Sequence, residues 1–145
     1  ISPPALADRL ELLITHATGC TAAFTQYAGM EALTGPQDFV TNMVNDYQRR
    51  RDRMLELVNA IPGVHAQKPQ GAFYVWARIS DAWGGYSGAK NSWAMTNYLI
   101  DQAGIGTSPG VAFGPSGERY VRFAFTVAPE VLIESIEVMQ DLFNK

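Results

Sequence analysis

Hydrophobic residues recur at every third or fourth position through the long stretch from residue 36 to residue 61. A polar side rich in arginine, aspartate, glutamine and glutamate alternates with this apolar stripe. Such spacing predicts one long amphipathic helix of about seven turns, which the pair Pro62-Gly63 ends. The stripe consists of Val40, Met43, Val44, Tyr47, Met54, Val58 and Ile61.

Two shorter helical patterns precede this helix. The first begins at Pro3-Pro4 and fades at residues 16–19, and the second fits Thr21 to Leu33. No strand pattern lies between them, so these two helices have little within the chain to pack against. We therefore expect residues 1–35 to be a helical remnant of a larger neighbouring domain, and residues 36–145 to form a small C-terminal domain.

The pattern changes to short β-prone runs after residue 63. With the helices between and after them, these runs give the order α-β-β-α-β-β-α from residue 36 onward. That order predicts an α+β fold in which helices cover a small sheet. The expected elements are strands at 64–66 and 71–77, a loop at 81–90, a helix from Asn91 to Asp101 with Gly104 as its stop, two strands joined by a tight turn within 104–125, and a helix from Pro129.

Composition and charge exclude several classes of function. The chain has 145 residues and a net charge of −3, and its arginine run at 49–53 is flanked by acidic residues at helical spacing. We interpret the run as an ion-paired, solvated helix face and expect no nucleic-acid binding. No apolar run reaches membrane-spanning length, and we expect no metal site. The single cysteine, Cys20, cannot form an intrachain disulfide, so we expect a small buried residue and a cytoplasmic protein.

One candidate for binding chemistry is Arg122, which stands in the otherwise apolar run from Tyr120 to Phe125. A buried guanidinium is costly unless an anion satisfies it, and its planar fork matches a carboxylate through two parallel hydrogen bonds. Arg122 is therefore a candidate carboxylate-binding residue. Two alternatives stay open: an ion pair with Glu118, or a position on a solvated sheet face. The nearby run 114–117 could form a phosphate nest, but a hairpin turn explains it better.

Six motifs occur along the chain in a fixed order. Together they resemble the C-terminal part of the class I/II aminotransferases, which are aspartate aminotransferase-like enzymes of fold type I that use pyridoxal phosphate. The resemblance extends over essentially the whole chain. The motifs are His16-Ala17-Thr18-Gly19-Cys20, Gly35-Pro36-Gln37-Asp38, Arg49-Arg50-Arg51-Asp52, Pro69-Gln70-Gly71-Ala72-Phe73-Tyr74, Pro109-Gly110-Val111-Ala112-Phe113-Gly114 and Tyr120-Val121-Arg122-Phe123-Ala124-Phe125.

The resemblance implies roles for particular residues. Arg122 would bind the α-carboxylate of an amino-acid substrate, and Phe73 and Tyr74 would pack beside it, although both also suit a strand core. Thr18 would approach the cofactor site across a homodimer interface, and His16 lies in the same segment. The implied activity moves an amino group between an amino acid and a 2-oxo acid, with pyridoxal 5′-phosphate as cofactor.

The catalytic lysine that this chemistry requires is not evident in the chain. Its three lysines, Lys68, Lys90 and Lys145, lie outside the family's lysine motif, and we expect all three to be exposed. We therefore expect a fragment that lacks the N-terminal cofactor domain and is inactive alone. The alternatives are a stand-alone ligand-sensing or interaction module with an α+β fold, and a fragment of a pyridoxal-phosphate-dependent β-lyase.

Overall fold

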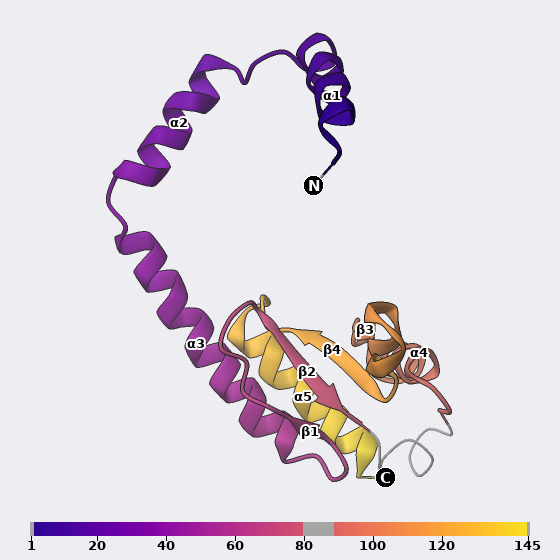
Figure 1. Cartoon of the computed structure of the whole chain (residues 1–145). Helices are drawn as coiled ribbons and strands as arrows, with labels where there is room; N and C mark the ends of the chain where they lie inside the picture. The colour runs from indigo at the N-terminus through magenta and orange to yellow at the C-terminus, as the bar shows by residue number, and fades with distance from the viewer. Residues whose placement is uncertain (1, 80–88, 145) are drawn as a thin grey trace. The chain divides into compact units, whose positions relative to one another are not determined.

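A computed structural model describes residues 2–79 and 89–144 (Figure 1). The chain divides into two compact units, Ile1–Val40 and Thr41–Lys145. Most of the loop expected at 81–90, like the terminal Lys145, lies outside the described residues.

The first unit is helical. It contains α1 (Pro4–Ala17), α2 (Ala23–Thr34) and the beginning of α3 (Asp38–Asn59). Neither α1 nor α2 has a buried residue. Cys20, in the turn between them, is also exposed, so the expectation of a buried cysteine was wrong. The helices carry exposed large apolar side chains at Leu6, Leu10, Leu12, Leu13, Ile14, Phe24, Tyr27, Met30 and Leu33.

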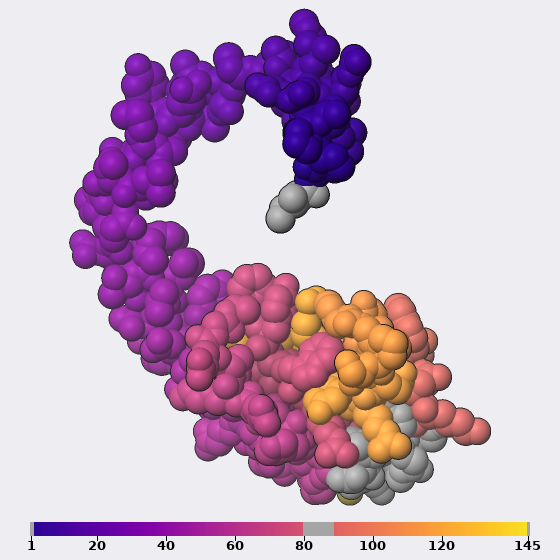
Figure 2. All heavy atoms as spheres, in the orientation of Figure 1, coloured from indigo at the N-terminus to yellow at the C-terminus, as the bar shows by residue number. Residues whose placement is uncertain are grey.

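The second unit has the predicted α+β fold. Its sheet contains β1 (His65–Ala66), β2 (Tyr74–Arg78), β3 (Ser108–Pro109) and β4 (Tyr120–Ala124). The spatial order is β1-β2-β4-β3, and every neighbouring pair is antiparallel. Figure 2 shows the atoms around β2 (magenta) lying beside those around β4 (orange).

Alternation along the two long strands separates the faces of the sheet. Val75, Ala77, Val121 and Phe123 are buried, whereas the residues between them are more exposed. The buried set forms a single core with apolar residues of α3, α4 (Ser92–Ala103) and α5 (Pro129–Phe143). The opposite face of the sheet therefore presents the alternate residues of β2 and β4.

The helix ends confirm the local predictions for α4. The Asn91 side chain accepts a hydrogen bond from the Ala94 amide at 2.8 Å, which satisfies one of the free donors of the first turn. Gly104 ends the helix in the left-handed conformation, with φ of 68°. Both residues act as the sequence indicated.

The turn before β4 differs from the simple hairpin that the sequence predicted. It contains two short 3-10 helices, η1 (Gly110–Phe113) and η2 (Pro115–Gly117), and β3 has only two residues. Pro109 ends β3 because proline has no backbone N–H to extend the ladder. The expected strand at 71–77 likewise begins only at Tyr74, after Ala72 with φ of 60°.

Candidate functional site

Arg122 lies at the middle of β4, on the sheet face opposite the core. Its neighbours across the sheet are Trp76 of β2 and Ser108 of β3. The register therefore places the guanidinium among side chains from three strands.

Two aromatic rings flank the Arg122 guanidinium. Its central carbon lies 4.0 Å from the ring centre of Tyr74 and 4.4 Å from that of Phe113. Both distances are within the range of a cation–π interaction. Rings that flank a guanidinium shield it from water and leave its N–H edge for acceptors.

The hydrogen-bond donors of Arg122 are only partly satisfied. Its Nη2 donates to the Ser108 hydroxyl at 3.2 Å, whereas its buried Nε has no acceptor among residues 2–79 and 89–144. No carboxylate of these residues forms an ion pair with Arg122. A partly desolvated cation without a counter-ion is costly, so the site favours an anion from outside the described residues.

The alternative ion pair with Glu118 does not form. The Glu118 carboxylate accepts a hydrogen bond from the Ser92 amide at 2.5 Å and another from the Arg119 amide at 3.3 Å. Glu118 thus joins the start of α4 to the turn before β4.

Of the residues predicted beside Arg122, Tyr74 contacts it directly. Phe73 packs on Tyr74, with 4.6 Å between ring centres, and lies 6.5 Å from the ring centre of Tyr47 on α3. Sequence reasoning missed the contacts that Ser108 and Phe113 make with Arg122. Phe113 belongs to the motif at residues 109–114, which could have indicated it. Ser108 becomes visible only through the register of β3 and β4.

Thr18 and His16 belong to the first unit. The Thr18 hydroxyl donates to the Ile14 carbonyl oxygen at 2.9 Å, which satisfies one acceptor at the end of α1. His16 is exposed in the last turn of that helix. Their proposed approach to a cofactor stays a prediction.

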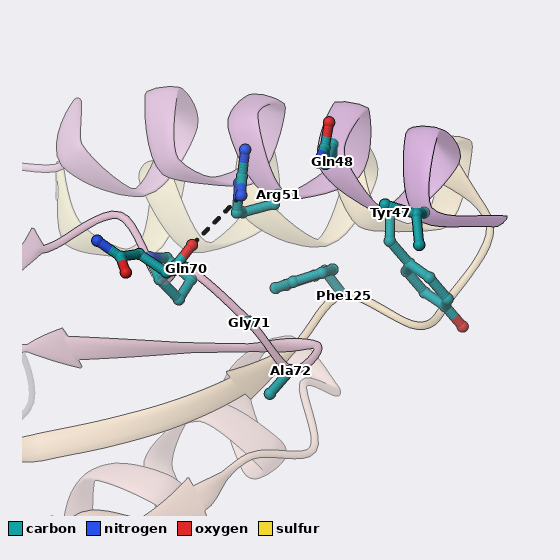
Figure 3. Close-up of a pocket in the computed structure, with 9 residues that line it drawn as sticks. Tyr47, Gln48, Arg51, Gln70, Gly71, Ala72 and Phe125 are labelled. Atoms are coloured by element: carbon teal, nitrogen blue, oxygen red, sulfur yellow. Dashed lines mark hydrogen bonds between the residues drawn. The ribbon is translucent and has the colours of Figure 1, made fainter. Parts of the chain in front are cut away.

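A second candidate is a pocket of about 270 Å³ between α3 and the segment 69–72. Figure 3 shows Arg51 directed at this segment, with Tyr47 and Phe125 at the other end of the pocket. Arg51 donates to the Pro69 carbonyl oxygen at 3.3 Å and to Asp52 at 2.8 Å. Because the protein itself already occupies these donors, this pocket makes a weaker anion site than Arg122.

The arginine run on α3 forms the ion pairs that its spacing predicted, but the expectation of a solvated face was wrong for Arg50 and Arg51, whose side chains are only 20% and 16% exposed. Its ion pairs are Arg49–Asp46 at 3.0 Å, Arg50–Asp46, Arg51–Asp52 at 2.8 Å and Arg53–Glu56 at 2.8 Å. Hydrogen bonds from Arg51 and then from Lys68 lower the pKa of the Asp52 carboxyl to about 2.

The lysines do not form a site for an aldehyde cofactor among the described residues. Lys68 and Lys90 are exposed, and Lys68 pairs with Asp52 at 2.9 Å. No group of three metal-ligating side chains occurs in the described part of the chain. No described helix is long and apolar enough to cross a membrane.

Comparison with known proteins decides the family. The model of aminotransferase class I and II matches residues 1–138. This chain belongs to that family. The LL-diaminopimelate aminotransferase of Moorella thermoacetica is 38% identical over 120 residues, which are 83% of this chain and 29% of that protein. The aspartate aminotransferase of Pyrococcus horikoshii is 33% identical over 138 residues, 94% of this chain and 34% of that protein.

Solved structures agree with the family. The crystal structure of the aspartate aminotransferase from Rhizobium meliloti superposes with a TM-score of 0.86 at 29% identity, covering 99% of this chain and 36% of that one. The chain thus spans about a third of the length of the aminotransferases that it matches. The predicted α+β aminotransferase fold is confirmed.

Proposed function

We propose that this chain supplies the substrate-carboxylate site of an enzyme that transfers an amino group between an amino acid and a 2-oxo acid. The observation that carries the proposal is the Arg122 guanidinium, which is flanked by two aromatic rings and has no counter-ion among the described residues. Every α-amino acid and every 2-oxo acid offers the carboxylate that this cation lacks.

Arg122 binds and orients the substrate in this proposal. Its planar fork donates to both carboxylate oxygens, and the hydrogen bond from Nη2 to the Ser108 hydroxyl helps to hold the fork in place. Fixing the carboxylate positions the α-carbon for proton transfer, since a held substrate reacts as if at high concentration. Tyr74 and Phe113 exclude water from the faces of the guanidinium, which strengthens its attraction for the anion.

Pyridoxal 5′-phosphate would supply the electron sink for this chemistry. The described lysines do not fit its aldehyde, because Lys68 is exposed and paired with Asp52, and Lys90 is also exposed. We infer that residues outside this chain hold the cofactor and provide the reactive lysine. The 145-residue chain alone is then inactive. We also infer a homodimer, in which Thr18 approaches the partner's cofactor site.

The test of the proposed function compares Arg122→Gln with Arg119→Gln in the complete enzyme. Both variants remove one positive charge from the same turn and strand, but Arg119 is exposed. Loss of a charged hydrogen-bond partner predicts that Arg122→Gln raises KM for the amino acid about 100-fold. Arg119→Gln should leave KM near the wild-type value.

Two results would contradict the proposal. An Arg122→Gln enzyme with the KM of the wild type would show that the substrate carboxylate binds elsewhere. The isolated 145-residue chain, mixed with pyridoxal phosphate and an amino acid, should show neither imine absorbance nor turnover. Turnover by this chain would refute the inference that the lysine lies outside it.

A further inference from the structure

Phe113 contacts the Arg122 guanidinium and belongs to a short helix outside the sheet. Tyr74 comes from β2, whereas Phe113 is the last residue of η1. The side chain of Phe113 is 53% exposed, so core packing does not account for its position. The centre of its ring lies 4.4 Å from the guanidinium carbon of Arg122. The ring centre of Tyr74 lies 4.0 Å from the same carbon.

Several contacts hold the Phe113 ring in place. The rings of Phe113 and Trp76 form an edge-to-face pair, with 5.5 Å between ring centres and 79° between ring planes. Trp76 in turn stacks on Tyr120, at 5.4 Å and 18°. The Val111 amide donates to the Ser92 hydroxyl at 3.4 Å, which ties η1 to the start of α4. The ring position is therefore fixed by the sheet and by α4 together.

A guanidinium in contact with two rings has restricted freedom. Both rings attract the cation, since its central carbon lies within cation–π range of each ring centre, and a different rotamer of Arg122 would lose one or both contacts. Ser108 at Nη2 fixes the remaining rotation within the plane. A lysine ammonium offers neither a plane to stack nor a fork to aim, so it would not replace Arg122.

We propose that Phe113 is a positioning residue, which holds the Arg122 fork against Tyr74 in the orientation that receives the substrate carboxylate. This inference rests on the proposed function of Arg122. The carboxylate contact exists both in the bound substrate and in the transition state. Loss of the Phe113 ring should therefore weaken the binding of substrates that carry a carboxylate, which raises their KM.

The experiment uses the complete enzyme with Phe113→Leu, Phe113→Tyr and, as control, Trp93→Leu. Trp93 is a similarly exposed aromatic residue on α4, 57% exposed. We expect Phe113→Leu to raise KM for the amino acid, and the dissociation constant of a competitive carboxylate inhibitor, about tenfold. Phe113→Tyr keeps the ring and should restore both values, and Trp93→Leu should change neither.

A second readout separates positioning from structural support. The same variants are assayed with an amine substrate that lacks the carboxylate, and their melting temperatures are recorded. Positioning predicts that Phe113→Leu leaves KM for the amine unchanged. An equal rise for both substrates, or a tenfold rise in KM that Phe113→Tyr does not reverse, would overturn the inference.

A double-mutant cycle tests the same inference if Phe113→Leu folds poorly. Phe113→Met keeps the apolar volume without the ring, and it is combined with Arg122→Lys. We expect Phe113→Met to raise KM for the amino acid about tenfold when position 122 is arginine, and much less when it is lysine. Equal effects in both backgrounds would overturn the role of Phe113, whereas a wild-type KM for Arg122→Gln would instead refute the proposed function.

Discussion

Gly110 and Gly117 pack against each other so closely that a Cβ atom added to Gly110 would lie 2.1 Å from the Gly117 carbonyl oxygen. The reverse substitution is equally crowded, because a Cβ on Gly117 would lie 2.1 Å from the Gly110 carbonyl oxygen. The contact joins η1 to η2 and so sets the path of the turn that carries Phe113. Only glycine allows this approach, since the opposing atoms are backbone.

Gly110→Ala should therefore destabilise the domain. Neither backbone segment can yield as a flexible side chain would, so we expect a loss of about 3 kcal/mol in the free energy of unfolding. Urea denaturation followed by circular dichroism measures the change. Gly106→Ala is the matched control, because a Cβ there meets nothing within 4 Å. Equal stability of the two variants would contradict the importance of the glycine contact.

Arg50 connects α3 to the segment that follows β4. Its Nη1 donates to the Val127 carbonyl oxygen at 2.8 Å and to that of Thr126 at 3.3 Å, and its Nη2 pairs with Asp46. Arg50→Met keeps much of the side-chain volume but leaves both carbonyl groups without this donor. We expect a loss of about 1–3 kcal/mol in the free energy of unfolding, measured in urea.

The control for this prediction is Arg49→Met. Arg49 pairs with the same Asp46 at 3.0 Å, but its side chain is 74% exposed. Surface ion pairs contribute little, so this variant should stay within about 0.5 kcal/mol of the wild type. If the two substitutions cost the same, the backbone contacts of Arg50 contribute nothing measurable.

Local sequence signals predicted the elements that depend on local chemistry. The apolar stripe from Val40 to Ile61 predicted α3, which ends at Asn59. The acidic residues near the arginines of this helix predicted its ion pairs. Asn91 and Gly104 marked the ends of α4 because capping depends on a few adjacent residues. Such signals need no knowledge of which strand lies beside which.

The missed features depend on contacts between distant parts of the chain. Ser108 became a partner of Arg122 through the register of β3 and β4, which hydrophobic alternation alone does not fix. The position of Phe113 depends on the glycine contact between η1 and η2. A single sequence shows glycines there but does not show that they touch. The unusual position of Arg122, a lone arginine in an apolar strand, was visible in the sequence, whereas its binding of a carboxylate stays a prediction.

Asn91→Ala tests the predicted helix cap. The variant loses the hydrogen bond from the Ala94 amide to the Asn91 side chain, so the first turn of α4 regains a free donor. We expect a loss of about 1 kcal/mol in the free energy of unfolding. Asn97→Ala, at an exposed position within the same helix, should be neutral or slightly stabilising because alanine is the better helix former. Equal losses of unfolding free energy in the two variants would contradict a specific contribution of the Asn91 cap.

The Asp52 carboxylate makes the ion pairs of α3 sensitive to acid. Its pKa is about 2, lowered from the ordinary 3.8 chiefly by the hydrogen bond from Arg51 and then by that from Lys68. A pKa lowered by folding means that the contribution to stability is full above about pH 4 and is lost as the pH falls through 2. An NMR titration of the Asp52 carboxyl carbon should give this midpoint directly. Arg51→Gln should raise the midpoint more than Lys68→Gln does, and the opposite order would show that Lys68 is the stronger partner.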